Sequence, residues 1–202
     1  MGKGERRSRA EMLEQTRCQL LQAAREHFSE YGYTATSMDE LTASVGLTRG
    51  ALYNHFGGKS GLMDAVVRDM DAELCVQLKA ILYAGDEDPI TALAERSRAY
   101  IEKTQTPAFQ RIMLTDAPAV VADAIEETSK ACIATLTEVL ADAQRQKLVS
   151  PNVAPAVIAT MLNGALADAS RWVAAADDNE RSERLRLALD SATALVEGLR
   201  IS

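Results

Sequence analysis

Two short helix signatures joined by a single glycine constrain this chain more than any other feature. Ser37 opens the S-x-x-E pattern of a capping box, which predicts a helix over about 38–45. Gly46 can adopt the left-handed conformation that ends such a helix, and Thr48 is suited to cap another helix over 49–55. Two short helices that meet at a tight turn have the layout of a helix-turn-helix unit.

Helical patterning continues along the rest of the chain, so we expect an all-α fold of about nine helices. Aromatic residues make up only 4% of the 202 residues, and alanine and leucine dominate the apolar positions. The period-two alternation of strands is scarce, whereas apolar residues recur at helical spacing. The expected helices span 9–31, 38–45, 49–55, 60–84, 89–104, a short segment between Pro107 and Pro118, 119–147, 154–176 and 180–200.

The chain divides into two parts that differ in charge. Residues 1–60 hold eight Lys and Arg against seven Asp and Glu, and residues 61–202 hold 14 against 22, within a formal net charge of −7. Such an asymmetry suggests two tasks. Because Gly57-Gly58 interrupts the chain before a long helix, we expect an arm and helix-turn-helix domain at 1–59 and a larger helical domain at 60–202.

Polar residues around the second helix of the pair are suited to contact DNA. Such a helix enters the major groove, where arginine can bind the edge of guanine, so Arg49 and the adjacent Gly50 are expected to face bases. Tyr53 and His55 lie where backbone phosphates pass, and Lys59 precedes a helix N-terminus that favours phosphate. The predicted DNA contacts are Thr36, Ser37, Thr48, Arg49, Gly50, Tyr53, Asn54, His55 and Lys59.

Some residues of this region also allow other interpretations. Gly58-Lys59-Ser60 looks like part of a nucleotide-binding loop, but Tyr53 occupies the place of a required glycine and no strand is expected before it. The basic arm could enter an adjacent groove or be an ordinary chain terminus; its residues are Lys3, Arg6, Arg7 and Arg9. His27 is interpreted as a structural residue at the edge of the core.

Composition argues against a metal centre, a bound cofactor, a membrane protein and an enzyme. The three cysteines are scattered and the only histidines are His27 and His55, so no His/Cys metal cluster is expected. Without a secretory signal or an apolar stretch of about 18 residues, we expect a cytoplasmic protein. Residues 61–202 contain no histidine, the commonest general base, and no Ser-His-Asp grouping is found.

Residues 16–62 resemble the DNA-binding domain of the TetR family of transcriptional regulators. The residues that carry the resemblance are Leu20-Leu21-Gln22-Ala23-Ala24, Phe28, Gly32-Tyr33, Thr36-Ser37, Leu41, Val45 to Tyr53, His55-Phe56, Lys59 and Leu62. It implies that Tyr53, His55 and Lys59 hold phosphates while Thr48, Arg49 and Gly50 face bases. The departures from the family pattern are His27, Asn54 and Gly57-Gly58, so an operator sequence cannot be carried over.

The resemblance further implies a homodimer that binds a palindromic DNA operator and is released by a small-molecule effector. Dimerisation is expected through the last two helices, 154–176 and 180–200, whose small apolar faces suit a four-helix bundle. We expect a repressor, with an activator or global DNA binder as the alternative, and a helical enzyme or binding protein as a weaker one. Helix 60–84 is the expected connection between effector and DNA.

Candidate ligand-binding residues lie on two segments of the larger domain. Met161, Asp168 and Trp172 share one helical face in 154–176. Tyr100, Phe109 and Met113 are expected to line the opposite side of the pocket. Asp168 could instead pair with Arg171 three residues later, which we slightly favour, and Trp172 could equally lie in the dimer core.

Overall fold

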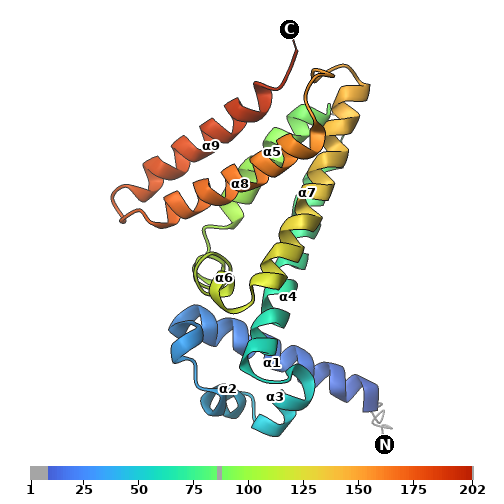
Figure 1. The fold of residues 1–202 in the computed structure, drawn as a ribbon. Helices are drawn as coiled ribbons and strands as arrows, with labels where there is room; N and C mark the ends of the chain where they lie inside the picture. Colours follow the sequence, from blue (N-terminus) through green and yellow to red (C-terminus); the bar gives the residue numbers. More distant parts are fainter. Residues whose placement is uncertain (1–8, 86–87, 202) are drawn as a thin grey trace, which may run out of the picture.

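The computed structural model describes residues 9–85 and 88–201, and in that part the fold is helical throughout (Figure 1). An isolated bridge between Val149 and Arg200 is the only strand-like pairing in these ranges. The all-α prediction is therefore confirmed. The helices are α1 (Arg9–Ala35), α2 (Met38–Ser44), α3 (Arg49–Phe56), α4 (Lys59–Leu82), α5 (Pro89–Lys103), the π-helix η1 (Phe109–Asp116), α6 (Ala117–Val120), α7 (Ala122–Arg145), α8 (Pro155–Ala174) and α9 (Arg181–Glu197).

The first three helices form one end of the molecule, and α8 and α9 lie side by side toward the other end (Figure 1). The long helix α4 leaves the first group and runs along α7 into the larger part (Figure 1). The basic arm predicted at 3–9 lies outside the described residues, apart from the backbone of Arg9 in α1.

Two hydrophobic cores hold these helices together. The first contains Phe28, Leu41 and Leu52 from α1, α2 and α3, and it continues through Val66 of α4 to Ile112 of η1. The second is built from α5, α7, α8 and α9. Since the first core extends past Lys59, the helix-turn-helix is packed directly on the elements that follow it.

The region around 107–121 differs from the sequence prediction. The short helix predicted between Pro107 and Pro118 is present but is of π type, as η1, and an unpredicted short helix, α6, follows with Pro118 in its first turn. The next helix begins at Ala122 rather than at 119, because Val121 adopts a non-helical backbone with φ −137° and ψ 54°. Proline fits the first turn of a helix, where its missing N–H is not needed, so Pro118 starts α6 rather than ending the previous segment.

Candidate nucleic-acid interface and internal cavity

Local capping determines the geometry of the helix-turn-helix. Ser37 Oγ accepts a hydrogen bond from Glu40 N at 3.3 Å, and Thr48 Oγ1 accepts one from Ala51 N at 3.2 Å. Gly46, between the two helices, has φ 66°, a conformation that costs other residues more. Each cap satisfies an N–H group that the first turn of a helix leaves free. The turn that orients α3 is thus encoded within a few residues.

The outer face of α3 is open to solvent. Thr48, Arg49, Gly50 and Asn54 are exposed, and Tyr53 is 51% exposed. His55 is half-buried, with its ring centre 6.0 Å from that of Phe56. Leu52, on the opposite side, is fully buried in the first core. The helix therefore presents most of the predicted DNA contacts outward and anchors itself by one leucine.

Arg49 has an acidic neighbour on α2. Its Nη1 lies 3.3 Å from Asp39 Oδ2, and both side chains are more than half exposed. An exposed pair of this kind contributes little to stability, and salt screens it. The Arg49 guanidinium therefore stays exposed at the N-terminus of α3. It can exchange the Asp39 carboxylate for another hydrogen-bond acceptor.

Lys59 performs a structural task that the sequence did not reveal. Its Nζ donates to the carbonyl oxygens of Thr34 at 3.2 Å and Thr36 at 2.7 Å, and it lies 4.8 Å from the centre of the Tyr33 ring. Burial lowers the pKa of Lys59. The ammonium group thereby joins the start of α4 to the end of α1. An ammonium has three donors, so one is left for a phosphate.

Thr36 does not fit the predicted phosphate contact. Its side chain is buried, and its Oγ1 is 2.7 Å from the carbonyl oxygen of Gly32 and 3.2 Å from that of His27. A hydroxyl carries a single proton to donate, and here these carbonyls engage it. Thr36 is therefore left out of the contact set proposed below. Ser37 is half-buried and occupied as the α2 cap.

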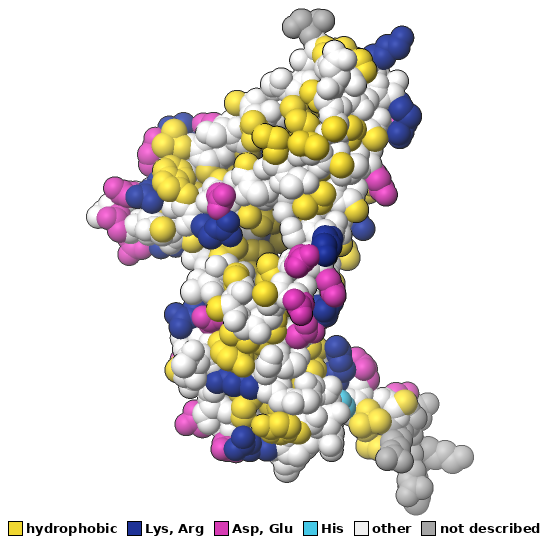
Figure 2. Space-filling view, in the orientation of Figure 1, with side chains coloured by type: hydrophobic (Ala, Val, Ile, Leu, Met, Phe, Trp, Pro, Cys, Tyr) yellow, Lys and Arg dark blue, Asp and Glu magenta, His cyan; other side chains and the backbone are white. Residues whose placement is uncertain are grey.

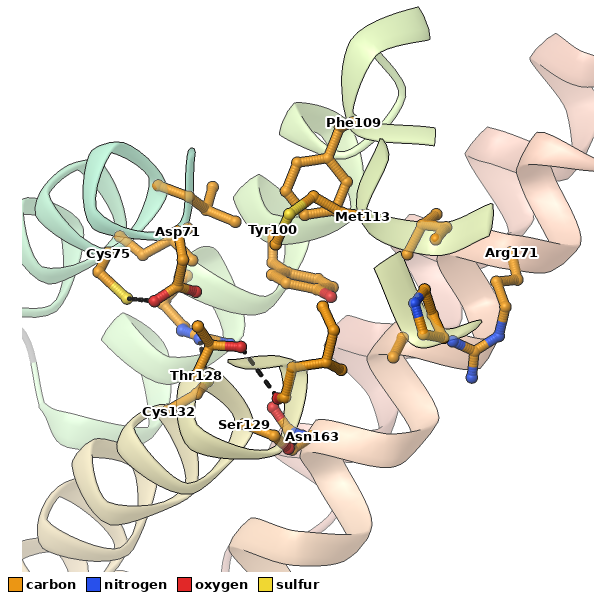
Figure 3. A pocket seen from close by; sticks show the side chains of 17 residues that line it. Asp71, Cys75, Tyr100, Phe109, Met113, Thr128, Ser129, Cys132, Asn163 and Arg171 are labelled. Carbon is orange, nitrogen blue, oxygen red and sulfur yellow. Dashed lines mark hydrogen bonds between the residues drawn. The ribbon is translucent and has the colours of Figure 1, made fainter. Parts of the chain in front are cut away.

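A cavity of about 140 Å³, partly open to solvent, lies between helices of the larger part of the molecule (Figure 3). Asp71 and Cys75 reach it from α4, and Tyr100 reaches it from α5. Phe109 and Met113 come from η1, while Pro118 of α6 and residues of α7 and α8 complete the lining (Figure 3). The three residues predicted for one side of a pocket, Tyr100, Phe109 and Met113, are thus brought together at one cavity.

The residues predicted for the other side of the pocket lie elsewhere. Met161 and Trp172 are 65% and 45% exposed, and Asp168 forms an exposed ion pair with Arg171. The prediction that Met161, Asp168 and Trp172 line this cavity is wrong, whereas the favoured alternative for Asp168, an ion pair with Arg171, is confirmed. Helix α8 instead turns Asn163, Ala167 and Arg171 toward the cavity. In a helix of mostly small residues, periodicity alone does not identify which of two apolar faces is internal.

Several polar groups of the cavity are missing from the sequence prediction. Arg96 of α5 is 5% exposed and donates from Nη2 to Cys132 Sγ at 3.0 Å. Burial raises the pKa of Asp71 and raises the pKa of Cys75 to about 11; it also raises the pKa of the predicted Tyr100 to about 12. The spacing of Arg96 and Tyr100, four residues apart on one helix, was the only sequence signal of their contact.

The cavity is connected to the helix-turn-helix through η1. While Phe109 and Met113 face the cavity, Asp116 Oδ2 at the other end of η1 accepts a hydrogen bond from Tyr33 N at 2.8 Å. Arg111 Nε lies 3.4 Å from the same carboxylate. Gly32 gives the guanidinium room, since a Cβ there would lie 2.0 Å from Arg111 Nη2. One π-helix therefore lines the cavity and also contacts α1, the helix against which α2 packs.

Apolar side chains remain exposed on the α8 and α9 pair. Trp172 and Leu187 flank a shallow groove lined by small residues of both helices, and Leu195 continues it. Figure 2 shows hydrophobic atoms gathered on the surface of the larger part. An exposed apolar patch of this kind is typical of a protein interface.

Neither a metal centre nor a membrane span is found where the structure is described. In residues 9–85 and 88–201, no three His, Cys, Asp or Glu side chains are grouped to hold a metal ion. Among the described helices, none combines the length and apolar character needed to cross a membrane.

Two segments of the chain match known families. Residues 20–66 match the family described as "Bacterial regulatory proteins, tetR family", and residues 90–199 match "Tetracyclin repressor-like, C-terminal domain". The crystal structure of a TetR-family transcriptional regulator, ECA1819 from Pectobacterium atrosepticum, is 40% identical, with a TM-score of 0.83, over 97% of this chain and 99% of that one.

Curated relatives match over shorter stretches. The HTH-type transcriptional regulator AcrR of Shigella flexneri is 32% identical over 104 residues, which are 50% of this chain and 47% of AcrR. The HTH-type transcriptional repressor Rv1474c of Mycobacterium tuberculosis is 40% identical over 53 residues, 26% of this chain and 28% of that protein. The chain thus matches about half or less of the length of these curated relatives.

Proposed function

The chain belongs to the TetR family of bacterial regulatory proteins, and from this premise we propose that it is a dimeric transcriptional repressor that a small-molecule effector releases from a palindromic operator. The observation that carries the proposal is the outward face of α3, capped at Thr48 and anchored by buried Leu52. DNA is the partner that such a helix fits. We propose a cytoplasmic location and no catalytic reaction, since the named relatives are regulators.

Most of the proposed DNA contacts are exposed residues of α3, and half-buried residues beside them complete the set. Thr48, Arg49 and Gly50 face bases, while Tyr53, Asn54 and His55 reach the phosphates beside them or a neighbouring base edge. Ser37 and Lys59 approach a phosphate at the N-termini of α2 and α4. Residues 1–59 form the DNA-binding part and residues 60–202 the effector and dimerisation part.

Selection of bound duplexes from a random pool, carried out at two salt concentrations, tests this proposal. We expect enrichment of two inverted half-sites and an affinity that falls with salt, because phosphate contacts release counter-ions. Lys59→Ala should lower the salt slope by about one unit and weaken all sequences alike. Lys79→Ala, at the far end of α4, is the matched control. An affinity that does not change with salt concentration, or the absence of any bound duplex, would contradict the proposal.

The apolar groove on α8 and α9 supports the proposed dimer. Two copies linked rigidly can read two half-sites, which gives a palindromic operator. Trp172→Glu should convert the dimer to a monomer in sedimentation equilibrium, because a charge would be buried in the interface. Val76→Glu, at an exposed apolar position on α4, should leave the dimer intact. A dimer that persists in Trp172→Glu would move the interface elsewhere.

Two connections support the proposed release by an effector. Helix α4 runs from Lys59 at the DNA-binding part to Leu74 and Leu78 at the cavity, and η1 joins the cavity to Tyr33. A ligand that binds one arrangement of these helices better shifts the equilibrium by about 1–3 kcal/mol in typical cases. Asp116→Ala should reduce the change in operator affinity caused by ligand, measured by fluorescence anisotropy. An unchanged response would leave α4 as the sole connection.

A repressor and an activator differ in the output, so a reporter decides between them. The selected operator is placed within a promoter that drives a reporter, with and without the protein. Lower expression in the presence of the protein supports a repressor, and higher expression supports the activator alternative.

A further inference from the structure

A buried guanidinium faces the cavity without a carboxylate partner. Arg96 is 5% exposed, and its neighbours are Cys132 Sγ, at 3.0 Å from Nη2, and the Tyr100 ring, whose centre lies 5.6 Å from Cζ. Within residues 9–85 and 88–201, no Asp or Glu oxygen comes within 4.0 Å of its nitrogens. The arginine is thus held in place by a sulfur and a ring.

These neighbours leave the charge of Arg96 uncompensated. A guanidinium has five N–H donors and stays protonated in proteins, whereas a thiol sulfur is only a weak acceptor. A ring below the guanidinium attracts the cation but does not neutralise it. Because a buried charge is costly unless it is paired, the free donors of Arg96 mark the place where an anionic group is stabilised best.

The other charged groups at the cavity favour the same sign of ligand. Arg171 of α8 also lines it, and Asp71 is the one carboxyl group among the described lining residues. Asp71 accepts a hydrogen bond from the Cys75 thiol at 3.7 Å, and burial raises its pKa, which favours its neutral form. Arg171 already pairs with Asp168 at the surface, so Arg96 is the guanidinium at the cavity for which the described residues supply no ion pair.

The remaining lining sets the size and character of the ligand. Leu74, Phe109, Met113 and Ile125 give the cavity an apolar surface, and its volume is about 140 Å³. A cavity of roughly 150 Å³ lined by apolar side chains accepts benzene. The space is therefore suited to one small ring or a short aliphatic chain, with a polar group at one end.

We propose that the effector is a small monocarboxylate with an apolar body, whose carboxylate is bound by the fork of Arg96. The planar guanidinium matches a carboxylate with two parallel hydrogen bonds. The apolar body lies against Phe109 and Met113 of η1. This inference rests on the proposed function, because it names the ligand class of the effector cavity.

Matched ligands test the proposal on the unaltered full-length chain. Isothermal titration calorimetry compares benzoate with benzamide and benzylamine, and hexanoate with hexanamide and hexylamine. We expect a carboxylate to bind roughly tenfold to a hundredfold more tightly than its amide, because a charge-assisted pair replaces a neutral contact, and the amine to bind most weakly. An amide or amine that binds as tightly as its carboxylate, or no binding by either carboxylate, overturns the inference.

Variants of α5 assign the preference to one residue. Arg96→Gln should remove the preference for the carboxylate over the amide, and Arg96→Lys should keep part of it, because a charge without the fork remains. Arg98→Gln, two residues along and outside the cavity lining, should bind as wild type does. A folded Arg96→Gln variant that keeps the preference overturns the inference. If this variant does not fold, the matched ligands on the wild type decide.

The failure of this inference is distinguishable from failure of the proposed function. A neutral or cationic molecule that binds the cavity and releases the selected operator would leave the proposed function intact and overturn the carboxylate assignment. A carboxylate that binds through Arg96 but leaves operator affinity unchanged would keep the assignment and contradict ligand control of DNA binding.

Discussion

The two candidate sites are built in opposite ways. The outer face of α3 takes its residues from a single segment, with caps at Ser37 and Thr48 and a glycine at position 46 between them. The cavity takes its residues from α4, α5, η1, α7 and α8, which are far apart in the sequence. Local chemistry therefore specifies the first site, whereas the second exists only once distant helices have packed.

The substitution with the largest expected effect on the locally encoded site lies at the junction of α3 and α4. A Cβ on Gly61 would lie 1.8 Å from the carbonyl oxygen of Phe56, so the backbones must separate to admit it. We expect Gly61→Ala to destabilise the protein by about 1–3 kcal/mol or more and to displace α3. Urea unfolding followed by circular dichroism measures the loss, and operator affinity reports the displacement.

Gly50→Ala is the matched control for Gly61→Ala. A Cβ at Gly50 meets only Thr48 Oγ1 at 3.7 Å, an ordinary contact. Alanine in a helix should leave stability unchanged or raise it by up to about 1 kcal/mol. If Gly61→Ala unfolds no earlier than Gly50→Ala, the close approach of α3 and α4 does not matter to stability, and the junction is more tolerant than its geometry implies.

Arg49→Ala tests whether the locally encoded face reads sequence. Since arginine can bind one base edge with two hydrogen bonds, we expect a loss of about 1–3 kcal/mol confined to one base pair of each half-site. Competition among single-base variants of the selected operator measures it. Arg98→Ala, which removes the same charge far from α3, should change no base preference. A loss spread evenly over all sequences would reassign Arg49 to phosphate.

The N-terminal part was predictable because its instructions are short-range. Caps at Ser37 and Thr48 and a positive φ at Gly46 follow from residue chemistry alone, so the bounds of α2 and α3 were predicted to within a residue or so. The sequence did not reveal two tertiary contacts in this part: the contact of Lys59 with the end of α1, and the packing that buries Thr36. The DNA contacts themselves stay predictions.

The cavity was only half predictable, and the reason is packing. Tyr100, Phe109 and Met113 were predicted for one side of a pocket, and large apolar groups of this kind usually face inward. Helix α8 has small residues on two faces. Helical periodicity therefore could not identify which face lines the cavity and which face, the one that carries Trp172, is exposed. The π-helix shifts the register after Phe109, and no turn signal announces such a shift.

Thr48→Ala measures how much of the fold one local cap supplies. Loss of the bond from Ala51 N should cost about 0.5–2 kcal/mol, because a helix N-terminal N–H loses its acceptor. Urea unfolding gives the value. Thr160→Ala, on an exposed position of α8 where the hydroxyl donates to a carbonyl within its own helix, should cost little. Equal losses in the two variants would show that the α3 cap is not special.

Asp88 allows a local and a distant interaction to be compared in one side chain, because its carboxylate both caps α5 and binds Arg200. Its Oδ1 caps α5 by accepting from Ile90 N at 3.0 Å, and its oxygens lie 2.9 and 3.0 Å from Nη2 of Arg200, beyond the end of α9. The hydrogen bond from Arg200 is the main cause that lowers the pKa of Asp88 from 3.8 to about 2. Because its pKa is lower in the folded protein, Asp88 stabilises the fold at pH values above its ordinary pKa of about 4. This contribution is lost as the pH falls from about 4 to about 2.

Asp88→Asn separates the two tasks, since asparagine caps a helix as well as aspartate does but carries no charge. We expect a small loss of stability at neutral pH and a shallower decline of the urea midpoint between about pH 4 and pH 2 than in wild type. Arg200→Gln should reproduce both effects, whereas Asp123→Asn, an exposed acid in the first turn of α7, should reproduce neither. If Asp88→Asn and wild type decline in parallel, the carboxylate acts only as a cap, and the distant contact adds nothing to the packing of α5 with the end of α9.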